Sequence, residues 1–411
     1  MLSLKNKIFP FIHQTKDNPI ATILPLWFIL RFITSLWVAL VSTLRPFTEI
    51  EKRLPLWPPS SHPSDWLERA IIAPWQRWDT EWYEKIITKG YHMDDGTAQF
   101  HPLYPWLATP LARLGFHPVL SLLFVSSISS FLLLLCFLQL ARCDLSAEAA
   151  QTSTILLTTF PVAMILFAPY PEALFLTWAV LCLLWARRGQ WVLAGASGAL
   201  AMLTRQQGIF LTIPLAWELW EASGRSSRQI IKNWRSVLTL IMIPAGWLIW
   251  IAYRAIALND IVVKFNSFHS LVYSLFISPS ANQVVTEQQF IWPWQAIIIA
   301  FNILLNSPDV DIYVNLLLAI WFIIIIGLAW RKMRTSYRLY CFAITWISLS
   351  YYTGPVHPYM GLPRHLFLAF PVFIGLAPYI SKPQVRLLSL LPNIFGMIFL
   401  LWLFVLEGWV P

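Results

Sequence analysis

A short polar segment in the first quarter of the chain carries the side chains with the clearest capacity for chemistry. Asp79 follows Arg77 and Trp78 in the segment RWDTEWY, which spans residues 77–83. Its carboxylate can accept a proton from a hydroxyl group, and the neighbouring aromatic rings offer surfaces for a sugar or a lipid headgroup. The helical spacing of residues 79–89 predicts a short helix with Asp79 near its N-terminus. The alternative is that Asp79 only caps this helix, as aspartate often does.

Other polar residues stand at the predicted ends of apolar segments. Glu172 lies in the turn Pro-Tyr-Pro-Glu, where its carboxylate can bind a sugar hydroxyl or pair with Arg205. The alternative for Glu172 is a capping role at the start of the following helix. Arg205 precedes Gln206 and Gln207, whose amides can hydrogen-bond hydroxyl groups. Arg31 lies in the middle of an apolar segment, so we expect it to face the protein interior rather than lipid.

A metal ion is the less favoured way to hold an anion in this chain. Asp309 and Asp311 form an Asp-x-Asp pattern, a spacing with which some enzymes hold a hard divalent cation. They stand just before an apolar segment, however, where aspartate commonly marks the start of a helix. Asp94 and Asp95 form the other acidic pair, and the four cysteines show no CxxC spacing. We therefore predict no metal site and no cofactor.

The composition indicates what kind of protein must position these residues. Hydrophobic residues make up 57% of the 411 residues and charged residues only 12%, which is too little charge to cover the surface of a soluble domain of this length. The net charge of +9 is spread over short clusters between apolar runs. This pattern argues against nucleic-acid binding and indicates membrane topology.

Runs of about twenty apolar residues predict about eleven membrane spans in an all-α bundle. A large outer loop, 45–118, follows the first span, and the interrupted run 291–306 is predicted to be a re-entrant or interfacial segment. We treat the whole chain, 1–411, as a single membrane-embedded domain in which loop 45–118 carries interfacial helices. The predicted spans are 20–44, 119–141, 151–168, 173–187, 191–204, 209–221, 237–257, 312–330, 339–353, 365–380 and 387–407.

The basic clusters orient this map. Cytoplasmic loops of membrane proteins carry an excess of Lys and Arg. With the N-terminus inside, every predicted inner loop is basic, and Asp79, Glu172, Arg205 and Arg364 all fall on the outer side. The basic residues of these inner loops are Arg142, Arg187, Arg188, Arg225, Arg228, Lys232, Arg235, Arg331, Lys332, Arg334, Arg338, Lys382 and Arg386.

Four stretches together resemble a known enzyme family. RWDTEWYEKIITKGY begins at Arg77 and FHPLYPWL begins at Phe100; a long stretch from Pro169 to Leu211 contains the Tyr-Pro-Glu turn and ends after Thr-Arg; and GLPRHLFLAFPVF begins at Gly361. These stretches, in this order, are similar to the PIG-V-type mannosyltransferases, which include the second mannosyltransferase of GPI-anchor synthesis and bacterial relatives. That family belongs to the GT-C superfamily of membrane glycosyltransferases.

The resemblance implies an inverting transfer of mannose or another hexose from a polyprenyl- or dolichyl-phosphate donor. It implies that Asp79 is the general base of the first outer loop. Arg205 and Arg364 are the implied contacts of the donor phosphate, since the planar fork of arginine suits phosphate. Further substrate contacts are Arg77, Trp78, Glu172, Gln206 and His365. The segment after Arg205 departs from the commoner family pattern, which leaves the lipid or glycan acceptor open.

Other functions remain open on the sequence alone. A transporter or flippase of lipid-linked sugars would also need many spans and outer arginines, but its ionisable residues usually lie near the middle of the membrane. A non-catalytic subunit would not need Asp79, and a GT-C enzyme for a different sugar would share the same architecture. The short loops favour a prokaryotic plasma membrane, or the ER membrane in a eukaryote, with the site on the outer or luminal face.

Overall fold

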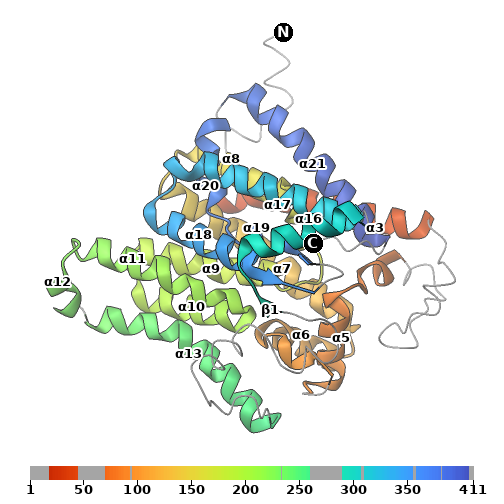
Figure 1. The fold of residues 1–411 in the computed structure, drawn as a ribbon, viewed down its shortest axis with the longest axis horizontal. Helices are drawn as coiled ribbons and strands as arrows, with labels where there is room; N and C mark the ends of the chain where they lie inside the picture. Colours follow the sequence, from red (N-terminus) through yellow and green to blue (C-terminus); the bar gives the residue numbers. More distant parts are fainter. Residues whose placement is uncertain are drawn as a thin grey trace.

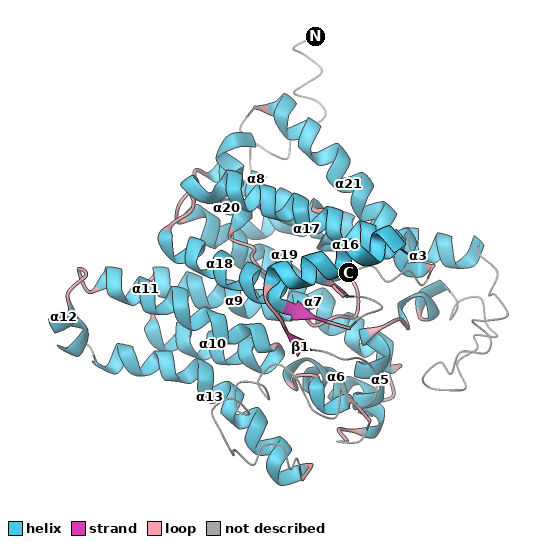
Figure 2. Ribbon diagram, viewed as in Figure 1, coloured by secondary structure: helices cyan, strands magenta, loops and turns pink. Residues whose placement is uncertain are grey.

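The computed structural model describes an almost entirely helical chain (Figures 1 and 2). It describes residues 18–44, 70–92, 95–232, 234–259, 289–306, 310–354, 358–380 and 382–406. Within these ranges the only β-structure is a two-stranded antiparallel pair, β1 (Gln289–Phe290) with β2 (Tyr351–Tyr352). The all-α fold expected from the apolar runs is therefore confirmed.

Five helices of the described residues are long and apolar enough to cross a membrane. Large apolar side chains are exposed along all five, and a hydrophobic face of this kind is stable against lipid rather than water. The chain is thus an integral membrane protein. The five helices are α3 (Pro19–Leu44), α7 (Pro118–Arg142), α13 (Trp234–Ala257), α17 (Val310–Ala329, continued by a 3-10 turn to Lys332) and α21 (Pro383–Val405).

Shorter helices fill the space between these five. One hydrophobic core runs through the bundle from α3 to α21, and a smaller one lies between α5, α6, α7 and α13. The shorter helices are α5 (Asp79–Lys89), α6 (Leu103–Arg113), α8 (Ala147–Thr159), α9 (Glu172–Arg187), α10 (Trp191–Thr204), α11 (Thr212–Ala222), α12 (Ser227–Lys232), α16 (Pro293–Asn306), α18 (Thr335–Ser350), α19 (Leu362–Phe367) and α20 (Val372–Leu376). The remaining 3-10 turns are Ala73–Trp75, Thr97–Gln99, Pro161–Leu166, Gln206–Leu211 and Ala377–Ile380.

Two predicted spans are not continuous helices. The expected span 151–168 ends as α8 at Thr159 and continues as a 3-10 turn from Pro161. The expected span 365–380 is divided into α19, α20 and a final 3-10 turn, with Pro371 at the start of α20. Proline has no backbone N–H and its ring collides with the preceding turn, so the α-helix stops at both places. Both segments are helical and apolar as predicted, but the breaks make their continuous α-helices shorter than the predicted spans.

The expected outer loop 45–118 is described from residue 70, apart from residues 93–94. It carries α5 and α6, and α6 packs against both α5 and α7. The run 291–306 forms α16, a single helix of 14 residues beginning at Pro293. It is shorter than a membrane span and packs against α18, which is consistent with the predicted interfacial segment.

Arg31 turns inward from α3, as expected. Its guanidinium donates a hydrogen bond to the backbone carbonyl of Phe167 and lies 6.0 Å from the ring of Trp75. The partner is thus a backbone carbonyl group at the end of a 3-10 turn. A carbonyl at an interrupted helix has a free lone pair, so the break at Pro161 supplies the partner.

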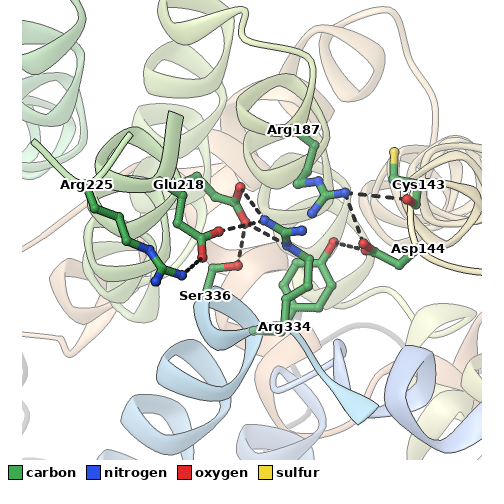
Figure 3. Close-up of polar contacts among 9 residues, drawn as sticks. Cys143, Asp144, Arg187, Glu218, Arg225, Arg334 and Ser336 are labelled. Carbon is green, nitrogen blue, oxygen red and sulfur yellow. Dashed lines mark hydrogen bonds and ion pairs between the residues drawn. The ribbon is translucent and has the colours of Figure 1, made fainter. Parts of the chain in front are cut away.

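An ionic network ties together the ends of four helices (Figure 3). We call Asp144, Arg187, Glu218, Glu221 and Arg334 the distal cluster. Arg187 pairs with Asp144 at 3.0 Å, while Arg334 pairs with Glu218 at 3.3 Å and with Glu221 at 2.7 Å. These residues lie at the end of α7, the end of α9, the last turns of α11 and the start of α18. The loops predicted to share the inner side therefore do lie together at one end of the bundle.

Close packing of α10 against α13 depends on Gly195. A Cβ atom at this position would lie 2.6 Å from the carbonyl oxygen of Thr239, which is too close for any real contact. Small residues of this kind let the helices of a membrane bundle approach each other closely. By contrast, Gly327 on α17 has nothing within 4 Å of where a Cβ atom would stand.

We therefore expect Gly195→Ala to lower the stability of the bundle and Gly327→Ala to leave it unchanged or slightly higher. The alanine at 195 would have to push a backbone carbonyl away, and overpacking of this kind costs about 1–3 kcal/mol. The measurement is thermal unfolding of both purified variants in the same detergent. Equal melting temperatures for the two variants would contradict the close approach of α10 and α13.

Candidate active site

Four separate segments bring charged side chains together at the other end of the bundle. Asp79 is the first residue of α5 and Glu172 is the first residue of α9. Arg205 directly follows α10, and Arg364 lies in α19. We call these four residues the site cluster. Since Glu172 begins α9 and Arg187 ends it, the site cluster and the distal cluster lie at opposite ends of this helix (α9, Figure 1).

The site cluster is a continuous chain of ion pairs. A carboxylate oxygen of Asp79 (Oδ2) lies 2.7 Å from Nη1 of Arg364. Nε of the same arginine lies 3.3 Å from Oε1 of Glu172. Arg205 donates to this same Oε1 through its Nη1. One oxygen of Glu172 is thus shared by two guanidinium groups. Asp79 contacts one of these groups, that of Arg364, through a different nitrogen atom.

Burial within the cluster increases from Asp79 to Glu172. The side chain of Asp79 is 25% exposed, Arg364 is 14% exposed, Arg205 is 11% exposed and Glu172 is completely buried. Among the described residues, the second oxygen of Glu172 (Oε2) has no hydrogen-bond partner. Burial alone lowers the pKa of Arg364, but the carboxylates of Asp79 and Glu172 outweigh it and raise the pKa above its usual value. Arg364 therefore stays positively charged.

Glycines allow the chain to place the two arginines. After Arg205 the chain turns into the 3-10 segment that contains Gly208, where a Cβ atom would lie 2.5 Å from backbone atoms of Met202. Only glycine lets this turn pack on the last turn of α10. Gly361 precedes α19 with a φ of 68°, a left-handed conformation that glycine adopts readily. Arg364 consequently lies close to the turn that begins α19.

Trp78 holds a strained backbone conformation next to Asp79. Its φ of 52° and ψ of −120° are rare for a residue with a side chain. Such strain costs on the order of 1–3 kcal/mol and is concentrated at functional sites. It turns the chain sharply before α5, so that the helix starts with Asp79 facing Arg364. Trp78 itself is half-buried and packs against the main hydrophobic core.

A buried acid fastens the start of α5 to the segment before it. Glu84 is fully buried and accepts hydrogen bonds from the side chain of Gln76 at 3.2 and 3.4 Å. Burial raises the pKa of Glu84 to about 8, although the bonds from Gln76 act in the opposite direction. Near neutral pH the group is therefore mostly protonated. Gln76 and Glu84 together fix the turn that carries Asp79.

The other predicted substrate contacts are placed less directly. Arg77 is buried and folds back to donate hydrogen bonds to the carbonyls of Ala73 and Gln76. His365 is buried beside the ring of Tyr351, with ring centres 5.8 Å apart. Arg77 lies two residues before Asp79, and His365 directly follows Arg364. Their predicted contacts with a substrate stay predictions, as does that of Trp78.

The amide beside Arg205 is that of Gln207 rather than Gln206. Oε1 of Gln207 lies 3.4 Å from Nε of Arg205, and its side chain is buried. Gln206 is half-buried, and its predicted contact with a substrate stays a prediction. The two neighbouring glutamines look alike in sequence, and only the 3-10 turn decides which of them faces the arginine.

Tyr170 is a member of the site that received no role in the sequence analysis. The guanidinium of Arg364 lies 5.2 Å from the centre of its ring, and its hydroxyl group hydrogen-bonds the backbone of Asp79. It thereby links the turn before α9 to the start of α5. The signal was present in the Tyr-Pro-Glu turn, where Tyr170 stands two residues before Glu172.

The acidic pairs weighed as metal ligands do not form a cluster where they are described. Asp95 pairs with Lys85 at 3.0 Å and accepts hydrogen bonds from Thr97. Asp309 and Asp94 lie outside the described residues. Within the described ranges, no group of three His, Cys, Asp or Glu side chains is arranged to hold a metal ion.

Part of the chain matches a family of known enzymes. Residues 99–250 match the family model described as dolichyl-phosphate-mannose-protein mannosyltransferase. This range includes Glu172 and Arg205 but neither Asp79 nor Arg364. No curated protein sequence matches the chain.

Several solved membrane enzymes have a similar arrangement of helices. ArnT from Cupriavidus metallidurans, bound to undecaprenyl phosphate, is 12% identical with a TM-score of 0.49, over 89% of this chain and 62% of that one. The oligosaccharyltransferase AglB from Archaeoglobus fulgidus, in complex with an inhibitory peptide and dolichol-phosphate, is 11% identical with a TM-score of 0.40, over 92% of this chain and 55% of that one. The chain thus spans less than two thirds of the length of either protein.

The buried acid beside the site predicts a dependence of stability on pH. A folded-state pKa of about 8 lies above the value of 4.5 for an unperturbed glutamate, so the folded protein keeps a proton that the unfolded chain loses. Stability therefore falls as pH rises from about 5 to about 8. Glu84→Gln mimics the protonated acid and should remove this fall, by on the order of a few kcal/mol.

The measurement compares thermal unfolding of wild type and Glu84→Gln at pH 5 and at pH 8.5. We expect similar melting temperatures at pH 5 and a higher one for the variant at pH 8.5. Glu148→Gln, at a largely exposed carboxylate, is the control. If Glu84→Gln were less stable than wild type at pH 8.5, the ionised acid would stabilise the fold, and its pKa could not be raised by burial.

Proposed function

We propose that this protein is an inverting glycosyltransferase that moves mannose from a polyprenyl- or dolichyl-phosphate donor to a lipid or glycan acceptor. The observation that carries the proposal is the contact of Asp79 with Arg364 in the site cluster. It places a partly exposed carboxylate, which can take a proton, beside a guanidinium that can hold a phosphate. These are the two groups that a transfer from a sugar phosphate needs.

The proposed reaction has a simple balance of bonds and charge. Asp79 accepts the proton of the acceptor hydroxyl while its oxygen attacks the anomeric carbon of the sugar. The bond from that carbon to the phosphate oxygen breaks, and its electron pair stays on the phosphate. Attack from the face opposite the leaving group inverts the anomeric centre. Arg364 and Arg205 stabilise the negative charge that develops on the leaving lipid phosphate.

Binding of the donor requires the site cluster to exchange partners. Nη1 of Arg364 contacts Asp79, and a donor phosphate would compete for the same group. A phosphate that replaces the carboxylate at Arg364 frees Asp79 to face the acceptor hydroxyl. Arg205 is held from the opposite side by Glu172 and Gln207, which orders its guanidinium before the donor arrives.

The match of residues 99–250 supports mannose and a lipid phosphate as the donor groups, since the matching family is described by a dolichyl-phosphate-mannose substrate. The PIG-V-type resemblance supports the same chemistry and names Asp79 as the base. An enzyme for a different hexose would use the same charged groups.

The position of the site cluster favours an enzyme over a transporter. A transporter usually binds its substrate near the middle of the membrane. Here Asp79 and Glu172 begin helices and Arg205 follows the end of one, so the charged groups lie at one end of the bundle. We further propose one membrane-embedded domain in a prokaryotic plasma membrane, with the site cluster on the outer face and the distal cluster on the inner face.

Asp79→Asn tests the proposed base. An amide cannot accept the proton, so we expect transfer from polyprenyl-phosphate mannose to a membrane lipid extract to fall by about a hundredfold or more. Binding of the donor should persist, because Arg205 and Arg364 remain. The measurement is turnover and donor affinity of purified wild type and variant.

Asp95→Asn is the matched control, because Asp95 lies in the same loop and pairs with Lys85 rather than with the site cluster. It should keep turnover within about threefold of wild type. Equal turnover in the Asp79 and Asp95 variants would reduce Asp79 to a helix-starting residue. Loss of donor binding together with turnover would assign Asp79 to holding Arg364 instead of to proton transfer.

The proposed topology is testable with a natural cysteine. Cys143 is exposed beside the distal cluster, whereas Cys182 and Cys341 are buried. An impermeant maleimide should therefore label Cys143 only after the membrane of spheroplasts is opened. Lys89→Cys, at an exposed position of α5 in a Cys143→Ser background, should react in intact spheroplasts. The reverse pattern would place the site cluster on the cytoplasmic face.

A further inference from the structure

Glu172 is the member of the site cluster to which the proposed reaction gives no step. It is completely buried, whereas Asp79 is 25% exposed. Oε1 accepts a hydrogen bond from Arg205 and lies 3.3 Å from Nε of Arg364, and Oε2 has no donor among the described residues. A buried carboxylate is retained only where nearby cations outweigh the loss of water. Here the two cations are those proposed to hold the lipid phosphate.

The charges of the four side chains of the site cluster add up to zero. Two carboxylates face two guanidinium groups, and the distances between them make one connected chain. Without Glu172, the same two arginines would leave the site with one positive charge in excess. Because the group is buried, water screens this difference little, and any phosphate bound to the arginines would experience it.

The two states of the lipid phosphate differ by about one charge. The donor is a phosphodiester with a single negative charge. After transfer the lipid carries a phosphomonoester, which bears about −1.5 to −2 at neutral pH. During the reaction Asp79 takes up the acceptor's proton, and this compensates for the charge gained by the leaving phosphate. Once Asp79 returns that proton to water, the product faces a cluster whose own charge is again zero.

We infer that Glu172 is a positioning residue that fixes Arg205 and Arg364 and, by its buried charge, keeps them from retaining the lipid phosphomonoester after transfer. This inference rests on the proposed function. Oε2 has no hydrogen-bond donor in the described part of the chain, so its charge is reduced only by the two arginines. The carboxylate of Glu172 therefore repels the more highly charged product phosphate more strongly than it repels the singly charged donor phosphate. Glu172 thereby favours release of product over release of donor.

The test compares two ligands that differ in charge and by one methyl group. Undecaprenyl phosphate is the monoester and its methyl ester is the diester, and both are titrated onto purified protein at pH 7.5. In wild type the monoester should bind less than about threefold tighter than the diester. In Glu172→Gln, which keeps a hydrogen-bonding oxygen but removes the charge, the monoester should bind at least about tenfold tighter than the diester.

A purely structural role of Glu172 predicts a different result. If its only function were to hold the arginines, Glu172→Gln would weaken both ligands alike and the ratio of affinities would not change. An unchanged ratio therefore overturns the inference. Steady-state kinetics provides the second readout, because tighter product binding should lower kcat and strengthen inhibition by undecaprenyl phosphate, with a smaller change in KM for the donor.

Two further variants separate charge from shape. Glu172→Asp keeps the charge with a shorter side chain, so its ratio should stay within about threefold of wild type; a tenfold preference for the monoester would overturn the inference. Glu218→Gln removes a buried carboxylate that pairs with Arg334 in the distal cluster and should not change the ratio. These variants control for the loss of any buried acid.

The outcome also separates this inference from the proposed function. If Glu172→Gln does not fold, the wild-type ratio alone decides, because a wild-type preference of tenfold or more for the monoester contradicts a charge-neutral site. If wild type binds neither ligand, the proposed lipid-phosphate donor is wrong and the inference falls with it. Binding of both ligands with the expected ratios supports both.

Discussion

The carboxylate of Glu172 constrains the arrangement of the helix ends around it. A fully buried negative charge is tolerated only while cations stay within contact distance, and removing one partner of such a pair typically costs about 3–5 kcal/mol. Its partners come from the end of α10 and from α19, and Arg364 in turn reaches the start of α5. Four segments that are far apart in sequence must therefore meet at one place in the fold.

The distal cluster applies the same constraint at the other end of the bundle. There, Arg334 at the start of α18 pairs with two glutamates in the last turns of α11, and Arg187 at the end of α9 pairs with Asp144 after α7 (Figure 3). Helix α9 has a member of an ionic cluster at each end. Sliding the helix along its axis would break both sets of pairs at once, so its register is fixed from both sides. The position of Glu172 in the site cluster is therefore fixed in part by the ion pairs at the far end of α9.

The sequence predicted most of what local pattern controls. Helices α9 and α10 begin and end within one residue of the expected 173–187 and 191–204, and the pairing of Glu172 with Arg205 was among the stated options. It could not predict what depends on contacts across the fold. The carbonyl partner of Arg31 exists only because the span after it is interrupted, and the contact of Tyr170 with Arg364 requires α19 to pack beside the turn before α9.

The length of α9 has a consequence for the surrounding lipid. Its 16 residues span about 24 Å, whereas the hydrocarbon core of a typical bilayer is about 30 Å thick. Charged groups at both ends of so short a helix stay out of hydrocarbon only if protein surrounds them or the bilayer becomes thinner locally. The two clusters therefore make this protein sensitive to hydrophobic mismatch. Membranes of long-chain lipids would strain the bundle, and those of short-chain lipids would match it.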